Sequence, residues 1–222
     1  MVLGMHRSGT SFLTGSLQQA GLELGKHSAW NPHNLKGNRE NQDIVAFHDQ
    51  VLAARGGAWD RPPGSAVVWN AVETQHAEAL VAEYKGVERW GFKDPRALLM
   101  VDAWLGLLPD LRFVGIFRNP VAVARSLAAR GAMPQQQAFA LWAAYNRHLL
   151  ALHRRTPFPL LCFDEDENVL HQKLDKILLE MGLQPLQDER FFSAELKHHR
   201  QSPGKLPAEL ESLYHALRKR AR

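Results

Sequence analysis

Short apolar segments alternate along the chain with longer stretches in which apolar residues recur every three or four positions. The short segments have the nearly continuous apolar character of strands that are buried on both faces. They are VLGM (2–5), RWGFK (89–93), RFVGIF (112–117) and FPLLCF (158–163). The helical periodicity predicts helices over residues 10–21, 40–55, 72–85, 97–107, 120–130, 135–154, 166–181 and 207–220. Because strands that alternate with helices build parallel sheets, the pattern predicts an α/β fold with a central parallel sheet.

The length and composition of the chain predict one soluble globular domain. The chain has 222 residues, of which 45% are hydrophobic and 23% are charged, and it contains neither an internal repeat nor a low-complexity tract. We therefore expect a single domain over residues 1–222. No apolar run approaches the roughly 18 residues of a membrane span. The first glycine-bearing turn begins at Gly4, so we expect no signal peptide and a first strand that lacks its upstream half.

The cysteine content and the net charge limit the cellular compartment and the kinds of partner that the sequence predicts. The one cysteine, Cys162, lies in an apolar segment and leaves no room for an internal disulfide framework, which fits a reducing compartment and a cytoplasmic protein. The net charge is only +4, and the basic residues over 218–222 are typical of a solvated helix end. The sequence therefore predicts no nucleic-acid partner, and it leaves the oligomeric state open.

The stretch GMHRSGTSF, which starts at Gly4, nearly matches a nucleotide phosphate-binding loop. That loop reads G-x-x-x-x-G-K-[ST], and its lysine contacts the outer phosphates, whereas Thr10 stands in the lysine position here. A turn of this kind between a strand and a helix binds anions through backbone N–H groups and the helix dipole. Without the lysine, we expect a phosphate-bearing ligand whose transferred group differs from the γ-phosphoryl group of ATP. The residues expected to bind it are His6, Arg7, Ser8, Gly9, Thr10 and Ser11.

A second anion-binding segment is predicted in FRNPVAVARSLAAR, which follows the apolar strand ending at Phe117. Arg118 stands at the end of that strand, and Pro120 suits the first turn of the next helix. Ser126 and Arg130 are four residues apart and therefore share one face of this helix. If the helix folds back beside its strand, these side chains converge on one compact anion. Two such segments imply a ligand with two separated anionic groups.

Together the two motifs resemble those of sulfotransferases that use 3′-phosphoadenosine 5′-phosphosulfate (PAPS). GMHRSGTSF is similar to their phosphosulfate loop, and FRNPVAVARS is similar to their 3′-phosphate motif, in which an arginine and a serine stand eight residues apart. Residues 38–52, 91–96 and 163–183 resemble segments of a widespread bacterial group of this family, so the resemblance covers about residues 2–200. It implies a three-layer αβα, P-loop NTPase-like sulfotransferase fold, with PAPS as the donor, 3′,5′-adenosine bisphosphate (PAP) as the product and no metal requirement.

The resemblance also implies catalytic roles. Arg7 matches the basic residue of the family loop and is expected to stabilise the charge on the bridging oxygen, as is Lys93 at the end of the segment RWGFK. Asp94 is expected to orient its neighbours or to cap a helix, and Arg96 could contact either the donor or the acceptor. Glu40 resembles a glutamate that serves as the general base in several branches. Other candidates for the base are His27, His33 and His48.

The donor-binding residues implied by the resemblance are Arg118 and Ser126 for the 3′-phosphate, together with Arg130, which matches a basic position of the tyrosylprotein branch. Arg200, in ELKHHRQ (195–201), is a further candidate. The C-terminal RKGxxGDWK-type segment of the cytosolic branch is absent. The adenine pocket cannot be located, although Trp59 and Trp69 are available aromatic residues whose expected role is packing.

The acceptor and two rival functions stay open. Resemblance to bacterial members favours a hydroxyl, or an amine, of a carbohydrate or glycolipid, while tyrosine and small-molecule hydroxyls are alternatives. Loops over 22–39 and 56–70 are expected to shape this choice. A nucleotide or small-molecule kinase would need the missing lysine and a magnesium site, and a catalytically silent nucleotide-binding module would need neither. The eleven histidines show no HExxH or Cys-His spacing, so no metal site is predicted.

Overall fold

A computed structural model describes residues 1–27, 37–185 and 206–221 of the chain. A three-stranded parallel sheet lies at its centre in the order β1 (Val2–Leu3), β2 (Val114–Phe117) and β3 (Leu160–Cys162). Leu3 stands beside Gly115, and Gly115 stands beside Leu160. Every strand residue is buried. Three of the four apolar segments therefore form strands, and the prediction of an α/β fold with a parallel sheet is confirmed.

Helices form at each of the predicted periodic stretches, with boundaries that differ by a few residues. They are α1 (Thr10–Gln19), α2 (Gln42–Ala53), α3 (Ala71–Ala82), α4 (Val101–Leu107), α5 (Pro120–Gly131), α6 (Gln135–Arg155), α7 (Glu167–Glu180) and α8 (Ala208–Arg218). Asparagine or aspartate side chains cap several of their first turns, as Asn41 does for α2 and Asp166 for α7. Within the described ranges, no helix is both long and apolar enough to cross a bilayer.

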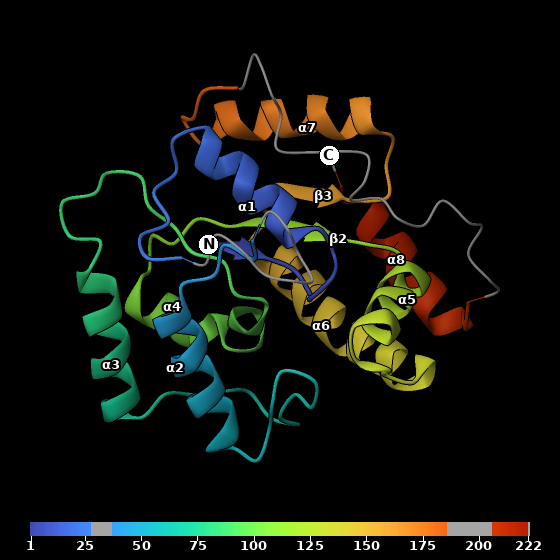
Figure 1. The fold of residues 1–222 in the computed structure, drawn as a ribbon, viewed down its shortest axis with the longest axis horizontal. Helices are drawn as coiled ribbons and strands as arrows, with labels where there is room; N and C mark the ends of the chain where they lie inside the picture. Colours follow the sequence, from blue (N-terminus) through green and yellow to red (C-terminus); the bar gives the residue numbers. More distant parts are fainter. Residues whose placement is uncertain (28–36, 186–205, 222) are drawn as a thin grey trace.

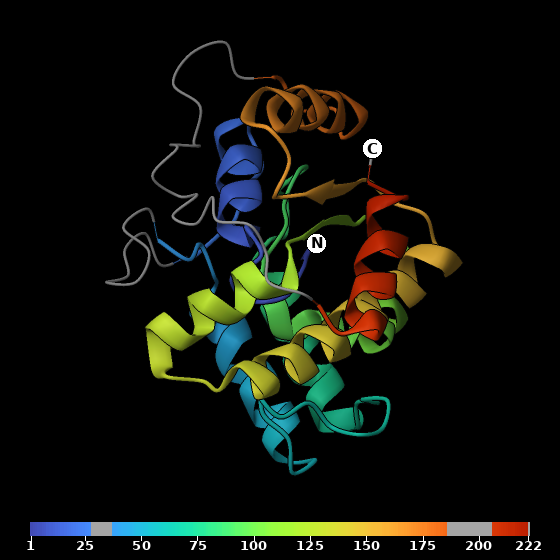
Figure 2. The same ribbon diagram turned by 90° about the vertical axis from the view of Figure 1, so that its right-hand side faces the viewer.

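The sheet separates two hydrophobic clusters. Val2, Val114, Ile116 and Leu161 of the strands pack with α1 and α7 on one face. Leu3, Phe117, Leu160 and Cys162 belong to a larger cluster that includes residues of α2, α4, α5, α6 and α8. Figures 1 and 2 show α1 and α7 together on one side of the sheet and α6 on the other. The alternation of side chains along a strand supplies both faces with apolar groups.

Two expectations about residues 89–107 are wrong in detail. The segment RWGFK is not a strand of the sheet, because its ends pair with different partners: Trp90 forms a bridge with Glu23, whereas Lys93 forms one with Val2. The helix expected over 97–107 is divided at Met100 into a 3₁₀ turn, Pro95–Leu99, and α4. Asp94 caps this turn by accepting from the Arg96 N–H at 3.1 Å. These local pairings still bring Lys93 beside the end of β1.

Candidate functional site

The predicted phosphate-binding loop joins β1 to α1 and packs tightly against the ends of the other two strands. Gly9 precedes α1 with a φ of 90°, a conformation that favours glycine. A Cβ atom on Gly9 would lie 2.5 Å from the ring of Phe163, which follows β3, and one on Gly4 would lie 2.4 Å from the carbonyl oxygen of Ile116. Arg7 also has a positive φ, of 65°. The backbone is therefore held in a tight turn that ends at a helix N-terminus.

The side chains of the loop include buried polar groups that point to an anionic ligand. Ser8 is completely buried, and its Oγ has no hydrogen-bond partner among the described residues. Thr10 is also buried at the first position of α1. A buried hydroxyl without a partner costs about 1–3 kcal/mol, so it marks a place where a ligand oxygen could bind. Ser11 differs, because its hydroxyl reaches the carbonyl oxygen of Asn38 at 3.5 Å.

A hydrogen bond joins the loop to the second predicted anion-binding segment. Arg7 Nε donates to Ser126 Oγ, on α5, over 2.8 Å. Arg118 ends β2, is only 8% exposed and has an Nε atom that makes no hydrogen bond among the described residues. Its carbonyl oxygen accepts from Trp142 Nε1 at 2.9 Å, which fixes the backbone there. Side chains 119 positions apart in sequence thus meet at one place.

The electrostatics of this region favour negative charge. Burial lowers the pKa of Arg7, and the positive charges of Arg130 and Arg118 lower it further. Burial likewise lowers the pKa of Arg118, although the nearby carboxylate of Asp164 opposes that shift. The guanidinium group of Arg7 is therefore repelled by those of Arg130 and Arg118. An anion bound among them would relieve this repulsion and supply acceptors for their N–H groups.

Lys93 and Glu40 form a buried ion pair beside this cationic region. Lys93 Nζ lies 2.7 Å from Glu40 Oε1, and the two side chains are 2% and 12% exposed. Glu40 directly precedes Asn41, whose side chain caps α2, and Lys93 lies next to Val2 of β1. Two residues that the sequence proposes for separate catalytic roles are therefore in direct contact.

His48 is wrong as a candidate general base. Its Nδ1 lies 2.7 Å from Asp94 Oδ2 and its Nε2 accepts from Trp104 Nε1 at 3.0 Å, so both ring nitrogens have partners. The residue is fully buried. Burial alone would raise the pKa of Asp94, but the hydrogen bond from His48 and the charge of Arg96 hold it well below its usual value. Asp94 thus orients its neighbours, as the sequence predicts.

The other histidine candidates are placed differently. His27 Nδ1 lies 2.9 Å from the carbonyl oxygen of Gly25, and its Nε2 lies 3.2 Å from Gln18 Nε2. His33 and Arg200 lie outside the described residues, and their predicted roles stay predictions.

His6 lies inside the loop against two aromatic side chains. Its ring centroid is 4.6 Å from that of Trp59 and 6.1 Å from that of Tyr145, and its buried Nε2 has no hydrogen-bond partner among the described residues. Burial lowers the pKa of His6 to about 3, and the positive charges of Arg96, Lys93 and Arg130 act in the same direction. Trp59 therefore brings the 56–70 loop to the site, whereas Trp69 packs against Phe47 and Trp104 in the core.

This environment predicts a pH-dependent stability. The unfolded chain binds a proton at His6 below its ordinary pKa of 6.5, whereas the folded protein does so only near pH 3. The stability that the neutral histidine contributes to the folded protein is therefore complete above pH 6.5. It is lost as the pH falls below this value. Between pH 7.5 and pH 5, we expect wild type to lose about 2 kcal/mol more stability than His6→Gln. Urea unfolding at both pH values measures this difference, and equal losses would contradict the prediction.

Two polar residues of the site escaped sequence reasoning. Asp164 lies 3.7 Å from Arg118, measured from Oδ1 to Nε, and Tyr214 of α8 donates a hydrogen bond to Asp164 over 3.1 Å. A signal existed for Asp164, because a carboxylate directly after a buried strand reaches the same sheet edge as the loop. Tyr214 lies in an amphipathic helix, and no local pattern marks it.

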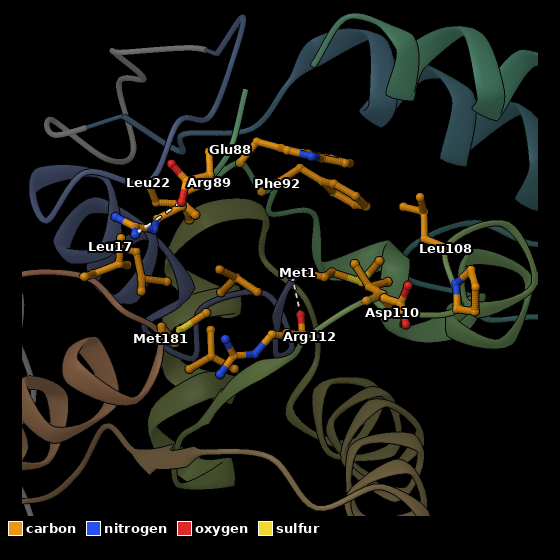
Figure 3. A pocket seen from close by; sticks show the side chains of 17 residues that line it. Met1, Leu17, Leu22, Glu88, Arg89, Phe92, Leu108, Asp110, Arg112 and Met181 are labelled. Carbon is orange, nitrogen blue, oxygen red and sulfur yellow. Dashed lines mark hydrogen bonds and ion pairs between the residues drawn. The ribbon is translucent and has the colours of Figure 1, made fainter. Parts of the chain in front are cut away.

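A separate cavity lies at the opposite edge of the sheet, where β1 and β2 begin. Its volume is about 390 Å³, and Figure 3 shows Leu17, Leu22, Phe92, Arg89 and Arg112 among the side chains around it. None of the predicted catalytic or donor-binding residues lines it. The candidate site is therefore the loop region at the carboxyl ends of the strands, where open α/β sheets bind their ligands.

Metal ligation has no support in the part of the chain that the structure describes. There, no group of three or more histidine, cysteine, aspartate or glutamate side chains is placed to hold an ion.

Comparison with known proteins identifies one relationship. The model of a family described as "Sulfotransferase family" matches residues 1–174. The matched range contains the loop, the Glu40–Lys93 pair, Arg118 and Asp164, and it ends before α8. No curated protein and no solved structure gives a significant match.

Proposed function

Because the chain belongs to the sulfotransferase family, we propose that it is an enzyme that transfers a sulfuryl group from PAPS to a hydroxyl or amine acceptor. The observation that carries this proposal is the junction of two anion-binding segments at the Arg7–Ser126 hydrogen bond. PAPS carries anionic groups at both ends of its ribose, so its two ends would require two such segments. We also propose the three-layer arrangement of the fold, which the hydrophobic clusters on both faces of the sheet support.

The donor fits the polar groups that the site leaves without partners. Backbone N–H groups at the start of α1, with Ser8 and Thr10, would hold the 5′-phosphosulfate end. Arg118 and Ser126 would hold the 3′-phosphate, and Arg118 Nε is buried and ready to donate. Bound there, the donor supplies an activated sulfuryl group. The site needs no metal in this proposal, since Arg7, Arg118 and Arg130 provide the positive charge.

The catalytic work of the chain is alignment, charge stabilisation and removal of one proton. Lys93 and Arg7 would face the negative charge that grows on the bridging oxygen when the sulfuryl group leaves. Glu40 would accept the proton of the attacking hydroxyl. The 2.7 Å contact between Glu40 and Lys93 places the proposed base and the proposed leaving-group cation at one site.

For the acceptor we propose a chemical class and not a single compound. A carbohydrate or glycolipid hydroxyl is our preferred class, and Trp59 supports it, because an aromatic ring beside the loop could stack on an apolar sugar face. Tyrosine and small-molecule hydroxyls are the alternatives. The single buried cysteine fits a reducing compartment, so we propose that the enzyme acts in the cytoplasm.

Calorimetric titration with PAP in the presence of EDTA, beside a titration with Mg-ATP, tests the proposed function. We expect PAP to bind without metal and Mg-ATP not to bind. Replacing Arg118 with methionine should weaken PAP binding by about 1.5–3 kcal/mol, because a charge-assisted contact is lost. The control Arg89→Met alters an arginine at the opposite cavity and should leave the affinity unchanged. Binding of Mg-ATP without binding of PAP would overturn the proposal and indicate a kinase.

A further inference from the structure

Arg118 has a counter-charge that does not hydrogen-bond to it. The nearest carboxylate oxygen, Asp164 Oδ1, lies 3.7 Å from Arg118 Nε, within the range of an ion pair but beyond that of a hydrogen bond. The Nε–H group is buried and has no partner among the described residues. Asp164 thus compensates the charge of the guanidinium and leaves this donor available.

The other oxygen of Asp164, Oδ2, is held in place by three donors. The backbone N–H of Asn119 donates to Oδ2 at 2.5 Å, and the hydroxyl of Tyr214 donates to the same oxygen at 3.1 Å. The thiol of Cys162 donates a third, longer hydrogen bond to it at 3.8 Å. With Oδ2 fixed by these donors, the carboxylate cannot rotate to present both oxygens to Arg118. Bidentate pairing, which arginine and carboxylate otherwise favour, is thereby prevented.

Tyr214 reaches Asp164 from helix α8, which begins at Ala208, beyond the matched range that ends at residue 174. The side chain is 9% exposed and packs edge-on against Phe117, with a centroid distance of 5.8 Å. It also lies 6.5 Å from the ring of Trp142, whose Nε1 holds the Arg118 carbonyl. Helix α8 is therefore fixed against the same residues that place Arg118.

We propose that Tyr214 is a positioning residue for the 3′-phosphate site: through Asp164 it keeps Arg118 available to the donor's 3′-phosphate. This inference rests on the proposed function. Without the hydroxyl, the carboxylate loses one of the three donors to Oδ2 and turns more easily toward the guanidinium. It then competes with the ligand phosphate for the same N–H groups. The C-terminal helix thus contributes to the proposed donor site through Asp164.

Comparing PAP with adenosine 5′-phosphate tests this role, because the two ligands differ only in the 3′-phosphate. Their affinity ratio, measured by calorimetry, isolates the contribution of that group. In Tyr214→Phe we expect the ratio to fall by about three- to tenfold, the size of one hydrogen bond, with adenosine 5′-phosphate binding unchanged. Cys162→Ala is the matched comparison: it removes the longer and weaker thiol donor to the same oxygen, keeps the Tyr214–Asp164 hydrogen bond, and should lower the ratio by less than about twofold.

Repeating the Tyr214→Phe comparison in a variant that lacks the Asp164 charge shows whether Tyr214 acts on the affinity ratio through Asp164. Asp164→Asn removes the charge that would compete for Arg118, so adding Tyr214→Phe to it should change the ratio by less than about twofold. Two results would overturn the inference: an unchanged ratio in Tyr214→Phe, or equal weakening of both ligands, which indicates a merely structural role. Failure of PAP to bind wild type would instead reject the proposed function, so the two failures are distinguishable.

Discussion

Replacing Glu40 with glutamine is expected to lower kcat by about 10²- to 10⁴-fold, the usual contribution of a general base. Glutamine keeps the volume of the side chain and an oxygen that can accept from Lys93, but it cannot take up the acceptor's proton. The rate is measured with labelled PAPS and whichever member of a panel of glycans, phenols and tyrosyl peptides the wild-type protein sulfates.

Affinity for PAP serves as the folding control for this variant, because the proposed donor contacts do not include Glu40. It should stay within about twofold of wild type. A kcat within tenfold of wild type would show that another group removes the proton. His27 would then be the first of the described candidates to replace, since His48 has both ring nitrogens occupied.

Replacing Lys93 with methionine is expected to lower the free energy of unfolding by about 3–5 kcal/mol, because the Glu40 carboxylate then stays buried without its partner. The double variant Glu40→Gln/Lys93→Met should recover most of this loss, since it removes both charges. Urea unfolding of the two single variants and the double variant gives the coupling energy of the pair. Additive losses would mean that the pair does not interact as its 2.7 Å contact indicates.

An exposed lysine–glutamate pair provides the comparison for the buried Glu40–Lys93 pair. Lys26 and Glu83 are 3.1 Å apart, but their side chains are 71% and 36% exposed. Lys26, which also lies 3.7 Å from Asp43, should therefore lose far less stability on replacement with methionine than Lys93 does, because exposed pairs contribute little. A similar cost at both sites would show that burial does not strengthen the Glu40–Lys93 interaction.

The elements of this fold could be predicted from sequence where local pattern decides the outcome. Helix α6 and strand β2 follow directly from their apolar periodicities. The segment RWGFK has the composition of a strand, yet its ends bridge to Glu23 and Val2, two residues that are distant in sequence. Pairing of this kind depends on which backbone lies alongside, and composition does not specify it.

In the candidate site, too, local motifs could be predicted from the sequence, whereas contacts between distant segments could not. Both predicted anion-binding segments stand out in the sequence because each is a strand, a turn and a helix start within one short stretch, and their binding role stays a prediction. Contacts between segments do not stand out in this way, since the Tyr214–Asp164 hydrogen bond spans 50 positions without a local signal. For His48 the sequence did contain a signal of burial: Ile44, Val51 and Leu52 share its helix face and are all buried. That neighbourhood is typical of a core histidine.

The ring of Phe163 limits which amino-acid substitutions the chain can accept in evolution. It occupies the space that a Cβ on Gly9 would need, and the Arg118 guanidinium lies 5.2 Å from its centroid. Positions 9 and 163 are therefore coupled: the phenyl ring and the left-handed φ of 90° each exclude a side chain at position 9. A smaller residue at 163 would remove only the first obstacle, and it would also take away the aromatic ring beside Arg118. The aromatic side chain at position 163 thus restricts substitution at both predicted anion-binding segments.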